Sequence, residues 1–166
     1  SSDLPATAEF DNLWLFDEES GEAVPFAEGH WKLRFDVRYE DASLTLGGGE
    51  TFTQNGLTFT IDAVTVSPVA FKVDYTVDSE VQWNDSGSGQ QSEADSREHA
   101  RYFENVEILL TKTDGTVVDL SNAGGSISPK DGSTVCSKGD FFREILPMEE
   151  LESISVGGVA YSLRAA

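Results

Sequence analysis

The sequence is poor in the side chains from which catalytic and metal sites are most often built. It holds one cysteine and two histidines among 166 residues. Cys136 cannot form an intramolecular disulfide, and it suits a small buried hydrophobic role better than a nucleophilic one. His30 and His99 do not share a spacing such as H-E-x-x-H, so we expect no zinc site built on histidine.

Basic residues are also scarce, which limits the classes of partner. Eleven Lys and Arg stand against 30 Asp and Glu, for a formal net charge of -19. This charge repels phosphate backbones and anionic lipid headgroups, so we expect neither nucleic acid nor direct membrane contact by this segment. The acids are scattered rather than clustered, as on the solvated faces of an extracellular or salt-exposed protein.

Long apolar runs and helical periodicity are missing as well. No stretch approaches the roughly 18 consecutive apolar residues of a membrane-spanning helix. No segment repeats apolar residues at i, i+3, i+4 and i+7 over three turns, so we expect almost no helix. The chain opens on Ser1-Ser2-Asp3, with no initiator Met or leader, and we interpret it as a mature or excised soluble segment whose anchor or signal lies outside it.

What the sequence does contain is strand periodicity, clearest over residues 56–77. Apolar residues alternate with polar ones over 57–61 and again over 69–77. The apolar phase slips by one residue near Asp62-Ala63, which predicts a β-bulge. Ser67-Pro68 predicts a wider turn or a crossing between sheets, because proline does not fit the tight primed turns. We expect this strand pair to form the centre of the core.

Strand patterns recur along the rest of the chain at short intervals. Further strands are predicted over residues 10–16, 30–39, 44–46, 51–53, 102–110, 116–120, 134–136, 141–146, 154–156 and 159–163. Asp114-Gly115 predicts a type I′ hairpin, Gly157-Gly158 a last hairpin, and Gly47-Gly48-Gly49 a hairpin loop or bulged edge. Residues 122–139 are predicted to be otherwise irregular, and residues 148–152 to hold one helical turn.

These patterns predict an all-β fold, a two-sheet immunoglobulin-like sandwich of about nine or ten strands, although composition does not exclude a barrel. Residues 1–9 are small and polar, so we expect a flexible N-terminal arm. Residues 10–166 are predicted to form a single β-sandwich domain. Within it, residues 84–98 contain no hydrophobic residue except Ala94 and are predicted to be a mobile loop.

Carboxylates are plentiful, so a paired-acid glycosidase is the enzyme class hardest to dismiss. Candidates such as Asp36, Asp74 and Glu107 lie on outward faces of predicted strands, where a solvated acid is the commoner explanation. No D-x-[DN]-x-[DN]-G calcium loop and no G-x-S-x-G nucleophile elbow occurs. We therefore predict a non-enzymatic protein with no catalytic, cofactor-binding or metal-binding residues and no cofactor, and the sequence singles out no partner-binding residue.

Aromatic residues offer material for a binding surface. The chain holds three Trp, four Tyr and ten Phe. Trp31 shares the phase of Leu33 and Phe35 in the amphipathic strand 30–39, and we expect all three to face the core. Trp14 and Trp83 are less constrained, and Trp83, beside the predicted loop, is expected to be partly exposed.

Three stretches together resemble a known family. They are HWKLRFDV at 30–37, LTFTIDAVTVSPVAFKVDYTV at 57–77, and FFREILPMEELESISVGGVAYSL at 141–163, the last after a strand-Asp-Gly-strand hairpin. Their order is similar to that in the uncharacterised β-sandwich ectodomains of bacterial membrane-anchored anti-sigma factors and related surface proteins. The closing family pattern L-x-x-I-x-x-I-x-I-x-G corresponds here to Ile145, Met148, Leu151, Ile154 and Val156 before Gly157. Residues 84–98 and 47–49 fall outside the family pattern.

The resemblance implies an extracytoplasmic bacterial domain, attached upstream to a transmembrane helix outside this chain. It implies a sensing or interaction role, with a protein or cell-envelope ligand, and transfers no catalytic residue. A carbohydrate-binding or adhesive module of a secreted or surface protein is the alternative, favoured by the acidity and the spare aromatics. A hydrolase ranks third.

Overall fold

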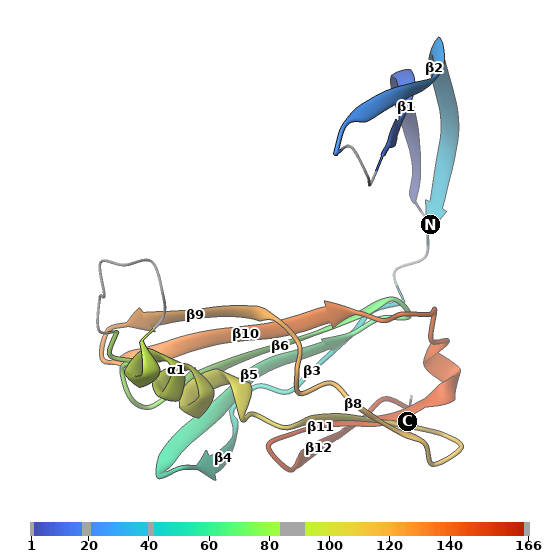
Figure 1. The fold of residues 1–166 in the computed structure, drawn as a ribbon. Helices are drawn as coiled ribbons and strands as arrows, with labels where there is room; N and C mark the ends of the chain where they lie inside the picture. The colour runs from blue at the N-terminus through green and yellow to red at the C-terminus, as the bar shows by residue number, and fades with distance from the viewer. Residues whose placement is uncertain (1, 18–20, 40–41, 84–91, 165–166) are drawn as a thin grey trace. The chain divides into compact units, whose positions relative to one another are not determined.

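The computed structural model describes residues 2–17, 21–39, 42–83 and 92–164. These residues form mostly β-strands and one short α-helix, which confirms the all-β class (Figure 1). They hold twelve strands, more than the nine or ten expected. The chain divides into a hairpin unit (Ser1–Asp41) and a two-sheet unit (Ala42–Ala166).

The two-sheet unit is built from two antiparallel sheets. The larger has the order β3-β5-β6-β10-β9, with β4 also paired to β5, and consists of β3 (Leu44–Leu46), β4 (Glu50–Gln54), β5 (Leu57–Val66), β6 (Ala70–Val77), β9 (Gly125–Lys130) and β10 (Ser133–Phe141). The smaller has the order β12-β11-β7-β8 and consists of β7 (Ile108–Lys112), β8 (Val117–Asp119), β11 (Leu151–Val156) and β12 (Val159–Ser162). One hydrophobic core takes residues from both sheets.

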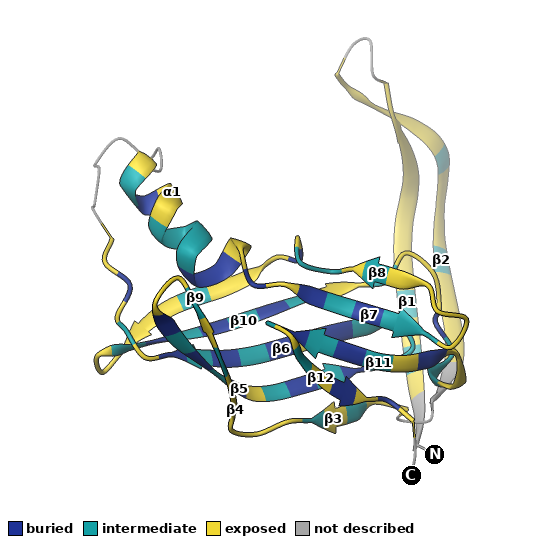
Figure 2. Cartoon of the chain, turned by 90° about the horizontal axis from the view of Figure 1, so that it is seen from below, coloured by how far each residue is buried: buried dark blue, intermediate teal, exposed yellow. Residues whose placement is uncertain are grey.

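The pair β5 and β6 lies at the centre of the buried surface, as expected (Figure 2). The register shifts between Ile61 and Ala63, which confirms the predicted bulge. Because the bulge absorbs one residue, Val64 and Val66 return to the buried face, where both are 0% exposed. In the β5–β6 turn, Ser67 N donates to Ala70 O at 2.9 Å. The two strands pair in one sheet, so this is the wider turn rather than a crossing.

The glycines at 47–49 interrupt one edge of the larger sheet, between β3 and β4. β3 and β4 follow one another along the same strand, β5, so the run is a bulged edge and not a hairpin loop. All three glycines have positive φ, and Gly49 N donates to Ile61 O at 2.9 Å. The break lets two short strands share one partner without leaving the sheet.

Two hairpins of the smaller sheet lie where the sequence places them. At β7–β8, Gly115 has positive φ but Asp114 does not, so the type I′ assignment is wrong although the hairpin itself is present. Asp114 instead stabilises the turn by accepting from Thr116 N at 2.8 Å. At β11–β12, Gly157 and Gly158 both have positive φ, as a type I′ turn requires.

The region 122–146 departs most from expectation. Residues predicted to be irregular form the hairpin β9–β10, and β10 runs from Ser133 to Phe141 instead of covering only 134–136. The reason is tertiary: β10 pairs with both β6 and β9, and two partners outweigh a composition rich in Gly, Ser and Lys. The strand predicted over 141–146 ends at Phe141. A 3-10 turn over Met148–Glu150 agrees with the predicted helical turn.

Of the loop predicted over 84–98, the described residues 92–98 are not strand, but most of them are helical. Residues 84–91 lie outside the described residues, and helix α1 (Glu93–His99) begins directly after Ser92. Ser92 Oγ accepts from Asp95 N at 3.0 Å, an N-cap that the composition argument did not weigh. A π-helical turn follows over Ala100–Glu104 and buries Tyr102 and Phe103, so the strand predicted from 102 begins only at Ile108.

The hairpin unit consists of β1 (Ser2–Phe16) and β2 (Ala23–Tyr39), paired antiparallel. Residues 2–9 are therefore strand, not a flexible arm, and the chain divides after Asp41 instead of forming one domain over 10–166. Apolar pairing explains the strand, because Ala6 and Ala8 lie opposite Phe35 and Leu33 of β2. Among the described residues, none that counts as buried core precedes Leu57.

Candidate functional site

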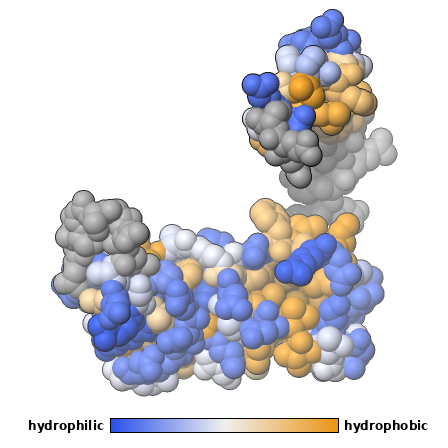
Figure 3. Space-filling view, viewed as in Figure 1, coloured by the Kyte–Doolittle hydropathy of each residue, from blue (hydrophilic) through white to orange (hydrophobic). Residues whose placement is uncertain are grey.

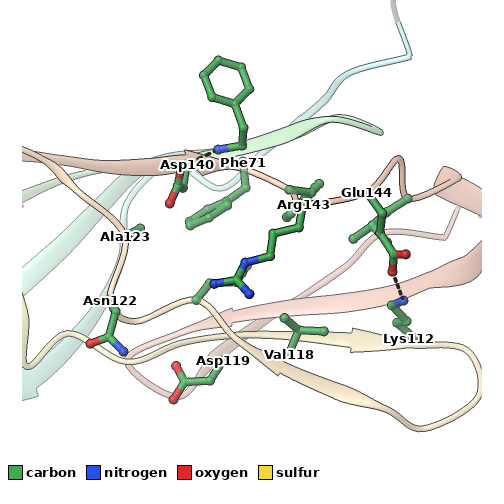
Figure 4. Close-up of a pocket in the computed structure, with 13 residues that line it drawn as sticks. Phe71, Lys112, Val118, Asp119, Asn122, Ala123, Asp140, Arg143 and Glu144 are labelled. Atoms are coloured by element: carbon green, nitrogen blue, oxygen red, sulfur yellow. Dashed lines mark hydrogen bonds and ion pairs between the residues drawn. The ribbon is translucent and has the colours of Figure 1, made fainter. Parts of the chain in front are cut away.

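An open cleft of about 690 Å³ lies in the two-sheet unit between the edge strand β8 and the segment that follows β10 (Figure 4). We call it the β8–β10 cleft. Its lining comes from separate stretches of chain and comprises Phe71, Lys112, Val118, Asp119, Leu120, Asn122, Ala123, Asp140, Phe141, Phe142, Arg143, Glu144 and Leu146.

The floor of the cleft is apolar. Phe71 and Phe142 stack with ring centroids 6.0 Å apart, and Phe71 and Leu146 are buried. Backbone hydrogen bonds hold this segment in place, since Phe142 N donates to Val69 O and Leu146 N to Pro68 O, both at 2.8 Å. The β5–β6 turn thus positions the residues that follow β10.

The rim of the cleft is charged and carries both signs. Lys112 Nζ lies 3.7 Å from Glu144 Oε1, and Asp140 Oδ1 accepts from Phe141 N at 2.8 Å. The hydroxyl and the backbone N–H of Ser121 hydrogen-bond to Asp119 and hold the pKa of its carboxyl below the usual value. Arg143 extends into the cleft in Figure 4 and forms no ion pair with any residue that the structure describes. The cleft therefore offers an apolar floor, carboxylates and a guanidinium with no ion-pair partner among the described residues.

Strand β10 also carries a buried amine. Lys138 is 0% exposed, and its Nζ donates to Phe103 O at 3.0 Å and to Ser121 O at 2.5 Å. It also lies 4.7 Å from the centroid of the Phe103 ring. Burial lowers the pKa of this ammonium, while Glu104 favours its charged form. Its contacts join β10 to the π-helical turn and to the chain after β8, which is a structural role.

Cys136 is buried, as the sequence predicts. Desolvation raises the pKa of its thiol to about 11, so it is protonated and unreactive at neutral pH. Next to it, Tyr75 donates its hydroxyl hydrogen to Tyr102 O at 2.9 Å, and Tyr102 in turn donates to Ser79 Oγ at 2.9 Å. These hydrogen bonds satisfy the hydroxyl groups of Tyr75 and Tyr102 inside the core.

The two histidines lie on different elements. His30 Nδ1 is 2.6 Å from Asp11 Oδ1 in the hairpin unit, and His99 Nδ1 is 3.0 Å from Glu104 Oε1 at the end of α1. Across residues 2–17, 21–39, 42–83 and 92–164, no group of three or more His, Cys, Asp or Glu side chains is placed to hold a metal ion.

Two of the carboxylates considered for a glycosidase, Asp74 and Glu107, lie on different segments of the two-sheet unit. Asp74 accepts from Lys72 Nζ at 2.8 Å on β6, whereas Glu107 is exposed just before β7. The side chain of Asp36 lies outside the described residues.

Of the three tryptophans, Trp83 is 41% exposed, which confirms the expectation for it, and Trp14 is 57% exposed. Trp31, expected in the core, lies instead on the hairpin unit, and its neighbours in phase, Leu33 and Phe35, are 55% and 50% exposed. Neither the β8–β10 cleft nor this exposed apolar face has a sequence motif. The cleft joins residues far apart in the chain. The alternation over 30–39 shows which face of the strand is apolar, but only the structure shows that Leu33 and Phe35 on this face are exposed.

Comparisons with known proteins identify no family. No protein-family model and no curated protein matches the chain. One similar solved structure is described as the crystal structure of the conserved domain protein from Bacillus anthracis, with 17% identity, a TM-score of 0.39, and coverage of 92% of this chain and 46% of that one. The chain thus spans about half the length of that protein. A likeness at this TM-score does not establish a shared fold or function.

No helix in the described residues combines the length and the apolar character needed to cross a membrane.

Proposed function

We propose that this chain is a non-enzymatic interaction domain that works outside the cytoplasmic membrane, as part of a bacterial membrane-anchored regulator or surface protein. The observation that carries the proposal is the β8–β10 cleft, an apolar floor with a charged rim beside an edge strand. The strand patterns that resemble anti-sigma-factor ectodomains supply the setting. In this proposal residues 42–166 form a two-sheet immunoglobulin-like sandwich, a scaffold suited to binding at its edges and loops.

The occupant we propose for the cleft is an extended peptide segment of a partner protein with an apolar residue next to a basic one. Among the described strands β8 pairs only with β7, so its other edge can accept a further strand by β-augmentation. Phe71 and Phe142 provide a floor for the apolar side chain. Asp119 and Asp140 attract the basic one, and the net charge of -19 strengthens that preference.

Selection of displayed random peptides on the purified chain tests this proposal. We expect enrichment of peptides that combine an apolar with a basic residue. Val118→Glu should weaken their affinity by at least about tenfold, because Val118 lines the cleft. Val117→Glu is the matched control, because Val117 is next to Val118 in the chain but is 55% exposed and does not line the cleft.

Two results would contradict the peptide cleft. One is a selection that enriches no peptide above background. The other is equal weakening by both variants, which would place the binding site elsewhere. Thermal unfolding of both variants tests whether they remain folded under the conditions of the binding measurement, so that a loss of affinity can be told from a loss of structure.

Exposed Trp83 favours a second candidate function, a carbohydrate-binding or adhesive module. Calorimetric titration with glycans and cell-wall fragments separates the two. A saturable signal that is lost in Trp83→Ala but kept in Val118→Glu would support the carbohydrate module and argue against the peptide cleft.

A further inference from the structure

The hairpin unit has one apolar and one charged face. Cross-strand neighbours on the apolar face are Ala6 and Phe35, Ala8 and Leu33, and Phe10 and Trp31. The opposite face carries the ion pairs of Lys32 with Glu9 and of His30 with Asp11. Such alternation is typical of a sheet with a core on one side and water on the other.

The described residues of the hairpin unit include nothing that covers this apolar face. Phe10, Leu33 and Phe35 are 47%, 55% and 50% exposed. Figure 3 shows hydrophobic residues gathered on one side of the hairpin unit. Beyond the register shift after Asp11, consecutive residues Trp14, Leu15 and Phe16 are 57%, 53% and 70% exposed, so both faces are apolar there. An isolated two-stranded hairpin is at best marginally stable in water.

We propose that β1 and β2 are two strands of a further β-sheet domain, completed by strands that precede β1 in a longer polypeptide. This inference is independent of the proposed function, because it concerns other residues than the β8–β10 cleft.

A second copy of the chain covers this surface poorly. If a fully exposed aromatic side chain presents about 200 Å², Phe10 and Phe35 each expose about 100 Å². With Trp31 and Leu33 the flat apolar face comes to roughly 400 Å², so two copies face to face bury on the order of 800 Å². Stable specific interfaces bury about 1,200 Å² or more. A single partner face also cannot cover both sides of residues 14–16.

The hairpin edges point to β-strands as the missing cover. β1 and β2 pair only with each other among the described residues. Each outer edge therefore presents backbone N–H and C=O groups that a further strand can pair. Added strands and a second layer satisfy the edges and cover the apolar surface together, which a helix or a loop does not.

The connectivity indicates from which side these strands come. β2 leads directly into the two-sheet unit, and β3 to β12 are all paired within their own two sheets. Strands in the same polypeptide act at an effective concentration of order millimolar. A separate copy pays the full entropy of association and, at a net charge of -19, meets like-charge repulsion. Preceding strands are therefore favoured over a partner in trans.

Hydrogen exchange followed by mass spectrometry tests the proposal. The 166-residue chain is compared with the product of the complete reading frame that encodes it. We expect amides within 6–13 and 31–35 to exchange at least about 100-fold more slowly in the longer product. Equal exchange in both, or a reading frame with no strand-forming segment before β1, overturns the proposal. Hairpin protection in the 166-residue chain that rises with concentration, together with a dimer in sedimentation, overturns it in favour of a second copy.

Two neighbouring substitutions on opposite faces of β2 sharpen this test in the longer product. Leu33→Gln should raise exchange of the hairpin amides at least about tenfold, whether it loosens the added domain or unfolds it. Arg34→Gln, on the charged face, should change exchange less than about twofold. Equal effects of the two variants overturn the proposal, because they show that the apolar face is not the covered one.

Discussion

At the scale of single residues, Phe71 connects the core to the cleft. It is 3% exposed on β6 and stacks against Phe142. Phe71→Ala should lower the free energy of unfolding by about 3 to 5 kcal/mol, as large-to-small aromatic substitutions in cores do. Urea unfolding measures the change. Phe141→Ala is the control, since Phe141 is 78% exposed and its loss should cost under about 0.5 kcal/mol. A shift under about 1 kcal/mol for Phe71→Ala would show that this face of β6 is not core.

A second residue-scale prediction concerns alkaline stability. Burial raises the pKa of Cys136 to about 11, above that of an unfolded thiol. A raised folded pKa contributes stability that is complete below the unfolded value of about 8.5 and is lost as pH rises toward 11. The pKa of Lys138 is lowered by burial, so its contribution changes with the opposite sign, and stability rises with pH up to the unfolded lysine value.

Cys136→Ala isolates the thiol, because Lys138 is present in both proteins. We expect the difference in unfolding free energy between wild type and variant to shrink by about 1 to 2 kcal/mol from pH 8.5 to pH 10.5. Urea titrations at several pH values measure it. Parallel pH curves for the two proteins would mean that the folded thiol ionises as readily as the unfolded one.

At the scale of elements, the β11–β12 turn shows how a hairpin depends on its surroundings. Gly157 and Gly158 both have positive φ, so alanine strains either position by roughly 1 kcal/mol. A Cβ at Gly157 would also lie 2.4 Å from the Phe52 ring, whereas a Cβ at Gly158 would meet nothing within 4 Å. Because Phe52 stacks on Phe59 with ring centroids 4.7 Å apart, its ring has little freedom to move away.

Gly157→Ala should therefore destabilise the protein by about 1 to 3 kcal/mol more than Gly158→Ala. Thermal unfolding of the two variants measures the difference, with the shared backbone cost cancelled. Equal destabilisation would show that β4 does not pack against the β11–β12 turn as described.

At the scale of the whole molecule, the core is confined to the two-sheet unit. Every buried core residue among those described lies between Leu57 and Leu163. Residues 42–166 expressed alone should therefore fold, and their free energy of unfolding should stay within about 1 kcal/mol of that of the full chain. Urea unfolding followed by far-ultraviolet circular dichroism measures this free energy for both proteins. Tryptophan fluorescence is less suitable, because residues 42–166 lack Trp14 and Trp31. A markedly lower urea midpoint for residues 42–166 would assign the hairpin unit a stabilising role.

The sequence by itself determined the strands whose side chains alternate strictly. β5 and β6 with their bulge, the β7–β8 and β11–β12 hairpins and the burial of Cys136 follow from local periodicity and turn residues, because period two and positive-φ glycines act over a few residues. The sequence also located Trp83 at the surface. It missed α1 and the π-helical turn after it, where an N-cap at Ser92 and the burial of Tyr102 and Phe103 outweigh a polar composition.

Only the tertiary structure decided the rest. β10 is a strand because β6 and β9 supply partners on both sides, and residues 2–9 are a strand because β2 lies opposite them. The β8–β10 cleft joins Phe71, Val118 and Arg143 from three distant segments, a proximity that no local pattern encodes. The hairpin unit shows the converse. The alternation over residues 30–39 of β2 is regular, yet regular alternation specifies only which face is apolar. What covers that face depends on chain partners that local sequence does not name.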